Sequence, residues 1–68
     1  MESKFSENFK FLRMESGLGQ EILAKKLKVS KGIISLWENG LREPSMSSLI
    51  TIADFFNVSI DYLVGRDN

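Results

Sequence analysis

Residues 17–45 read GLGQEILAKKLKVSKGIISLWENGLREPS. The stretch contains two short helical patterns separated by the segment 28–30. Apolar residues recur at helical spacing on one face of each pattern: Leu23, Ala24 and Leu27 in the first, and Ile34 and Trp37 in the second. Ser30 is a favourable N-cap for the second pattern, and Asn39-Gly40 is a favourable stop. The sequence therefore predicts one helix over about 20–27 and a second that follows Ser30.

Two helices joined by so short a turn cannot lie side by side in antiparallel orientation. They must cross steeply, which is the geometry of a helix-turn-helix. Ala24 supplies the small residue that a close crossing needs. This geometry leaves four residues on the outer face of the second helix: Lys31, Gly32, Ser35 and Leu36. A generic helical hairpin would show the same apolar spacing, so periodicity alone leaves both interpretations open.

The flanking sequence adds three more short helical patterns. The first ends near Gly17, the next runs from Ser45 to Asn57, and Ser59 caps the last. Their apolar residues again fall on one face of each segment: Phe5, Phe9 and Leu12, then Leu49, Ile52, Ala53 and Phe56, then Ile60, Leu63 and Val64. No stretch alternates at period two for the length of a strand. We therefore expect an all-α fold, a compact five-helix bundle whose second and third helices form the helix-turn-helix.

Length and composition limit the function classes. A chain of 68 residues has the size of one domain, so we expect a single domain over 1–68. Cys and His are absent, which excludes disulfides, zinc fingers and thiol or imidazole catalysis. No paired carboxylates or Gly-rich phosphate loop stand out, so we expect no enzyme, metal, cofactor or small-molecule substrate. No apolar run approaches the ~20 residues of a membrane span, so we expect a cytoplasmic protein.

The charges are distributed unevenly although the net charge is zero. Residues 20–42 carry five basic and two acidic side chains, a net charge of +3, and the remaining residues carry −3. A neutral protein with one basic segment can still attract an anion to that face. The basic segment coincides with the predicted helix-turn-helix, and this favours a nucleic-acid partner.

Residues 17–45, continued by LITIADFFNVSIDYLVG at 49–65, resemble the lambda-repressor/Cro-like helix-turn-helix regulators, often called the XRE family. The matching residues form a specific combination: Gln20, Leu23-Ala24, Val29-Ser30, Ile34-Ser35, Trp37-Glu38, Gly40 and Pro44. Because Leu12-Arg13 also matches, the resemblance covers nearly the whole chain. It implies a lambda-repressor-like DNA-binding fold.

The resemblance also implies roles for individual residues. Three residues occupy positions that contact DNA phosphates in the family: Gln20, Asn39 and Arg42. Four occupy positions that face base edges: Lys31, Gly32, Ser35 and Leu36. Arg13 and Glu38 resemble a buried ion pair with a structural role. Candidate dimer contacts lie in the last part of the chain: Val58, Ile60 and Tyr62.

Other residues depart from the family pattern. Gly32 offers no side-chain donor and weakens its helix by about 1 kcal/mol. Leu36 can contact a thymine methyl group but cannot form a hydrogen bond with a base. Lys28 replaces the usual turn glycine and is strained if its φ is positive. Five apolar residues stand where polar ones are more common: Phe11, Met14, Ile22, Leu36 and Leu41. They form a protein-binding patch if they are contiguous, whereas Phe11 and Met14 alternatively pack under the N-terminal residues.

We expect a sequence-specific regulator of transcription that binds double-stranded DNA. The small size suggests a phage or mobile-element repressor that acts as a homodimer by occupying its operator, in the cytoplasm and associated with the nucleoid. The chain length equally fits a domain of a longer protein. The alternative is a protein-interaction module on the same fold, an anti-repressor or modulator that binds a partner repressor. The retained Gln20, Lys31, Asn39 and Arg42 favour DNA.

Overall fold

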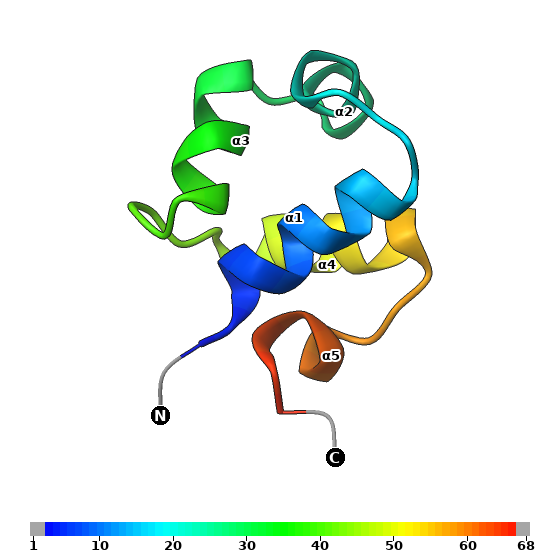
Figure 1. The fold of residues 1–68 in the computed structure, drawn as a ribbon. Helices are drawn as coiled ribbons and strands as arrows, with labels where there is room; N and C mark the ends of the chain where they lie inside the picture. The colour runs from blue at the N-terminus through cyan, green and yellow to red at the C-terminus, as the bar shows by residue number, and fades with distance from the viewer. Residues whose placement is uncertain (1–2, 67–68) are drawn as a thin grey trace.

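The computed structural model describes residues 3–66. Five helices follow one another in this part of the chain: α1 (Phe5–Glu15), α2 (Gln20–Leu27), α3 (Lys31–Glu38), α4 (Met46–Phe56) and α5 (Ile60–Val64). No strand interrupts them within 3–66, so the all-α prediction is confirmed. In Figure 1, α2 and α3 lie at one end of the molecule, and α5 lies below α1 and α4 at the other end.

Serine caps begin three of the helices where the sequence predicted them. Ser30, Ser45 and Ser59 accept hydrogen bonds from the backbone N–H three residues later, at 3.1, 3.2 and 2.9 Å. Each bond satisfies one of the N–H groups that have no partner inside the helix. Asn57 ends α4 in the left-handed conformation, with φ of 57°. The local signals therefore account for most of the helix boundaries.

Aromatic side chains fill the centre of the core. Phe9 is fully buried and packs on the Phe5 ring at 5.2 Å, while Trp37 of α3 meets Phe9 edge-on at 5.7 Å. Phe56 of α4 approaches Phe9 from another side, at 6.3 Å between ring centroids. The remaining buried side chains come from α2, α3, α4 and α5: Leu23, Ala24, Leu27, Ile34, Ile52, Ala53 and Leu63. The predicted inner faces are therefore the buried faces.

The two ends of the described chain are joined to each other. The backbone N–H of Lys4 donates to the Val64 carbonyl at 3.1 Å, and the Asn8 amide donates to the Tyr62 carbonyl at 2.9 Å. Gly65 is required next to this contact, because its φ is 83° and a Cβ there would lie 2.9 Å from the Lys4 side chain. The short α5 is thus held on α1, away from α2 and α3 (Figure 1).

None of the described helices is long and apolar enough to cross a membrane.

Candidate nucleic-acid interface

The turn between α2 and α3 depends on one residue with a positive φ. Lys28 has φ of 61° and ψ of 43°, so the residue that replaces the usual turn glycine keeps the left-handed conformation. The backbone N–H of Val29 then donates to the Ala24 carbonyl at 2.9 Å and closes the turn. Ala24 is buried, which lets the two helices approach closely. This turn orients α3 across α2 as a helix-turn-helix.

The start of α3 is exposed to solvent. Lys31 and Gly32 are exposed, whereas Ser35 and Leu36 are only half-buried. Asn39 donates from its amide to the Ser35 hydroxyl at 3.3 Å, so two of the residues predicted to contact DNA contact each other. The four residues predicted to face bases all remain accessible, but Leu36 is less exposed than an outward side chain would be.

Glu38 at the end of α3 connects three elements. Arg13 of α1 donates from Nε to Oε2 of Glu38 at 2.6 Å and from Nη2 to Oε1 at 3.2 Å. Gln20, the first residue of α2, donates from Nε2 to the same Oε1 at 3.0 Å. The side chain of Glu38 is 3% exposed and that of Arg13 is 14% exposed. The ion pair implied by the resemblance is therefore present, and it also holds the start of α2.

The Gln20–Glu38 hydrogen bond was not expected from the sequence. It uses one of the two N–H groups of the Gln20 amide and leaves the other for an outside acceptor. Because Glu38 is the last residue of α3, this contact couples the position of the α2 start to that of α3. A Gln followed eighteen residues later by a Glu carries no local signal of such a pair.

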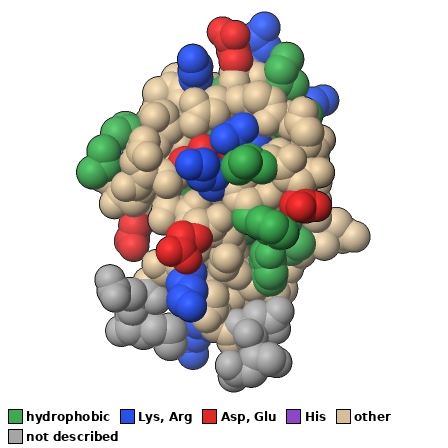
Figure 2. Space-filling view, viewed as in Figure 1, with side chains coloured by type: hydrophobic (Ala, Val, Ile, Leu, Met, Phe, Trp, Pro, Cys, Tyr) green, Lys and Arg blue, Asp and Glu red, His purple; other side chains and the backbone are tan. Residues whose placement is uncertain are grey.

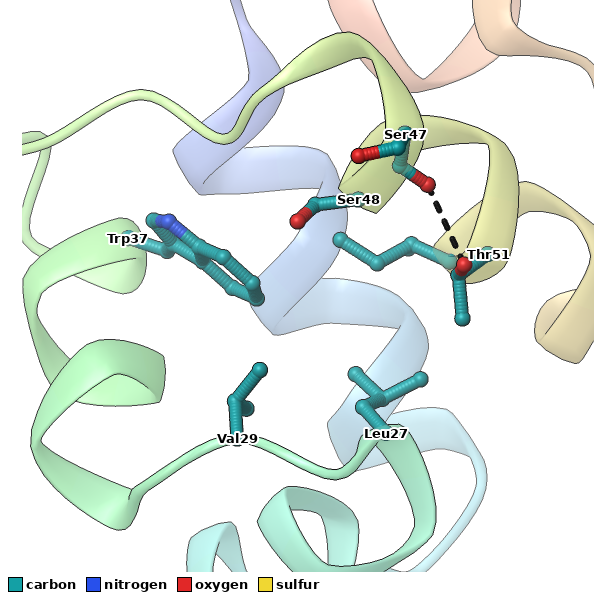
Figure 3. Close-up of a pocket in the computed structure, with 7 residues that line it drawn as sticks. Leu27, Val29, Trp37, Ser47, Ser48 and Thr51 are labelled. Atoms are coloured by element: carbon teal, nitrogen blue, oxygen red, sulfur yellow. Dashed lines mark hydrogen bonds between the residues drawn. The ribbon is translucent and has the colours of Figure 1, made fainter.

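The start of α4 lies beside the α2–α3 turn. A cavity of about 110 Å³ separates them, lined by Leu27 and Val29, by Trp37 and by the α4 residues Ser47, Ser48, Thr51 and Ile52. Figure 3 shows the Trp37 ring and the Val29 and Leu27 side chains directed toward the serine-bearing turn of α4, where the Thr51 hydroxyl donates to the Ser47 carbonyl at 3.1 Å.

A larger hollow of about 380 Å³ continues along the same edge and includes Ile33, Arg42 and Ser45. Sequence reasoning overlooked Ser47 and Ser48, although a helix start that follows Pro44-Ser45 has unpaired N–H groups.

The candidate dimer residues lie at the other end of the molecule. Val58, Ile60 and Tyr62 are all half-buried. Val58 and Ile60 pack against the core, so only part of each side chain is accessible. Three apolar side chains on α4 are more open: Met46, Ile50 and Phe55, exposed by 64%, 47% and 40%.

Four of the five apolar residues that depart from the family pattern are exposed. Phe11, Met14, Ile22 and Leu41 are exposed by 54%, 62%, 49% and 73%, and Leu36 is half-buried. One alternative was that Phe11 and Met14 pack under the N-terminal residues. Within residues 3–66 both side chains are exposed instead. Figure 2 shows hydrophobic side chains beside basic ones on the face of the molecule that α1 presents.

Comparisons with known proteins agree with this geometry. A helix-turn-helix family model matches residues 9–63. The chain is 46% identical over 64 residues to the HTH-type transcriptional activator BcrR of Enterococcus faecalis, covering 94% of this chain and 31% of that protein. It is 40% identical over 65 residues to the HTH-type transcriptional regulator YqaE of Bacillus subtilis, covering 94% of this chain and 56% of that protein. The chain thus spans from about a third to just over half of these relatives.

A solved structure gives the same arrangement of helices. The P22 c2 repressor, in complex with synthetic operator 9T, superposes with a TM-score of 0.85 at 30% sequence identity. The superposition covers 93% of this chain and 96% of that one. The similarity therefore extends over the whole bundle and includes the turn and both helices of the candidate interface.

Proposed function

The chain belongs to the helix-turn-helix family, of the lambda-repressor-like (XRE) type, and on that premise we propose that it regulates transcription by binding double-stranded DNA in a sequence-specific manner. The observation that carries the proposal is the similarity to the P22 c2 repressor, whose solved complex holds a synthetic operator. Family membership also supports a binding role in place of a catalytic one.

The geometry of α2 and α3 supports a division of roles. α3 enters the major groove, where Lys31, Gly32, Ser35 and Leu36 face base edges. Phosphates on either side are contacted by Gln20, whose amide is oriented by Glu38, and by Asn39 and Arg42 at the end of α3 and in the loop that follows it. The hydroxyls at the start of α4 extend the same edge. Phosphate contacts set the orientation of the domain, and α3 supplies the sequence preference.

Repression by operator occupancy is the finer form of the proposal. In it, two copies place their α3 helices in successive major grooves, about 34 Å apart, on a near-palindromic site. Val58, Ile60 and Tyr62 contribute to the contact between the copies, and the protein acts at the nucleoid as a phage or mobile-element repressor. The small size of the described bundle, with extents of 30 × 24 × 21 Å, fits one half-site.

The experiment that tests this function is selection of bound duplexes from a random double-stranded DNA library at moderate salt. A two-fold symmetric consensus, bound with nanomolar affinity, is the expected result. The dependence of that affinity on salt then measures the phosphate contacts. Sedimentation with and without the selected duplex determines whether two copies bind together. Absence of any enriched sequence contradicts the proposal.

One observation favours a second candidate function. Leu41 directly follows Gly40 after α3, and its side chain is 73% exposed. Phe11, Met14 and Ile22 are exposed as well, which fits a module that binds another regulator through apolar contacts. In that case the library yields no consensus and only weak, steeply salt-dependent binding. A Leu36→Ala variant then keeps all its DNA affinities and loses its protein complex.

A further inference from the structure

Gly32 has no structural reason to be a glycine. It lies in the first turn of α3 with an ordinary helical backbone and is exposed to solvent. A Cβ added at this position would meet nothing closer than the Ser30 hydroxyl oxygen at 3.7 Å, which is ordinary van der Waals contact. Glycine is nonetheless the least favourable residue for a helix interior apart from proline. The fold therefore loses stability at Gly32 without gaining any packing in return.

The neighbour of Gly32 on the same face is Leu36, one helical turn later. Side chains on a helix tilt toward its N-terminus, so the Leu36 side chain covers the surface next to Gly32. Together the bare backbone of Gly32 and the methyl groups of Leu36 make an apolar contact surface near the exposed start of α3.

The polar groups available on this face are few. Lys31 has an ammonium group, and the Ser35 hydroxyl already accepts a hydrogen bond from Asn39. Gly32 and Leu36 have no side-chain donor or acceptor. In the major groove, the one apolar group that a base pair presents is the C5 methyl group of thymine. An apolar surface on α3 is therefore suited to a methyl group.

We propose that Gly32 determines specificity: its missing side chain lets α3 approach a base pair closely enough for Gly32 and Leu36 to enclose the 5-methyl group of a pyrimidine. The inference rests on the DNA-binding function proposed above and names the chemical group that α3 reads. The same substitution that would stabilise the helix then displaces the methyl group from its contact.

The test combines one change in the protein with one change in the DNA. Affinities of wild type, Gly32→Ala and Gly32→Ser are measured on the selected duplex, and on duplexes in which uracil replaces each thymine in turn. Removing the methyl group lowers wild-type affinity about fourfold at one thymine of each half-site. Gly32→Ala lowers affinity about tenfold on the thymine duplex and clearly less on the uracil duplex, because the space left by the methyl group accepts the new Cβ.

Thermal melting separates this effect from damage to the fold. Gly32→Ala keeps Tm at or above the wild-type value while it lowers affinity, because the new Cβ meets no close neighbour in the free protein. Asn57→Gly is the matched control, an uncharged change at the left-handed residue that ends α4 and lies outside α2 and α3. This variant binds every duplex as the wild type does.

The outcomes are distinct. If the wild type selects no duplex, the proposed function itself fails. Two other results contradict the role of Gly32 and leave the proposed function standing. In the first, the wild type selects a duplex and Gly32→Ala binds that duplex equally well. In the second, Gly32→Ala loses affinity by the same factor on the thymine and uracil duplexes.

Discussion

The carboxylate of Glu38, at the end of α3, joins this helix to α1 and to the start of α2. Glu38 receives hydrogen bonds from Arg13 and Gln20, and Arg13 also donates to the Leu18 carbonyl at 2.8 Å. A buried charge is tolerated only where its partners replace the water that it has lost. At the scale of the residue, the start of α2 and the end of α3 are therefore positioned by the same two oxygen atoms.

Arg13→Met should lower the free energy of unfolding by about 3–5 kcal/mol, since it leaves the Glu38 charge buried without its cationic partner. Urea denaturation followed by circular dichroism measures the change. Arg42→Met is the control: it removes the same charge from an exposed side chain and should cost less than about 0.5 kcal/mol. Equal effects of the two substitutions would show that Glu38 finds other partners in solution.

Lys31→Ala should weaken DNA binding and flatten its salt dependence. A positive charge on the face of α3 that enters the groove neutralises at most one phosphate charge, so its removal reduces the slope of log K against log salt by at most about 0.9. The measurement is a titration of the selected duplex at several salt concentrations. Lys10→Ala removes the same charge from the exposed side of α1 and should leave the slope nearly unchanged. If the slope became equally flat in both variants, the salt dependence would reflect the net charge of the protein and not a contact made by α3.

At the scale of the element, the helix-turn-helix of α2 and α3 contains two residues that are unfavourable for stability. Lys28 occupies the left-handed region, where a residue with a Cβ is strained, and Gly32 stands in a helix where a residue with a Cβ would be preferred. Lys28 adds a positive charge to the basic segment, whereas Gly32 removes bulk from the face of α3. Both residues lower the stability of the element that is proposed to contact DNA. Residues at functional sites commonly lower stability in this way.

Lys28→Gly should therefore stabilise the domain by about 0.5–1 kcal/mol, because glycine adopts a positive φ without strain. The same substitution at Lys26, inside α2 and also exposed, should destabilise it by about 1 kcal/mol. Thermal or urea unfolding of the pair gives the sign of each effect directly. A destabilised Lys28→Gly variant would mean that the lysine side chain makes a stabilising contact in the turn.

At the scale of the whole molecule, stability rests on a small core in which aromatic rings from α1, α3 and α4 meet. Trp37 is 4% exposed and contacts both Phe5 and Phe9 edge-on. A domain of this size has a free energy of unfolding of only about 3–10 kcal/mol. The loss of one large core side chain is therefore comparable with the stability of the entire fold.

Trp37→Ala should cost about 3–5 kcal/mol and leave the domain largely or wholly unfolded at 37 °C. Far-UV circular dichroism and the cooperativity of melting report the result. Phe11→Ala removes an aromatic ring that is 54% exposed and should melt close to the wild type. If Trp37→Ala melted cooperatively at the wild-type temperature, the tryptophan could not be a principal part of the core.

The sequence by itself determined the helices, their caps, the turn and the buried faces. Those features depend on signals within a few residues, such as Ser30 before α3 or the spacing of Leu23 and Leu27, and local backbone energetics act over the same distance. The resemblance extended this to the fold and to a set of candidate contact residues.

Only the tertiary structure decided how distant residues meet. It revealed the bond from Gln20 to Glu38, the serines of α4 beside the α2–α3 turn, and the free space around Gly32. The first two arise from packing between helices that are separate in the chain, and the third from the absence of any such packing against Gly32. The sequence also left open whether Phe11 and Met14 pack under the N-terminal residues or are exposed. The exposure of a side chain depends on which parts of the fold cover it and not on the residue type alone.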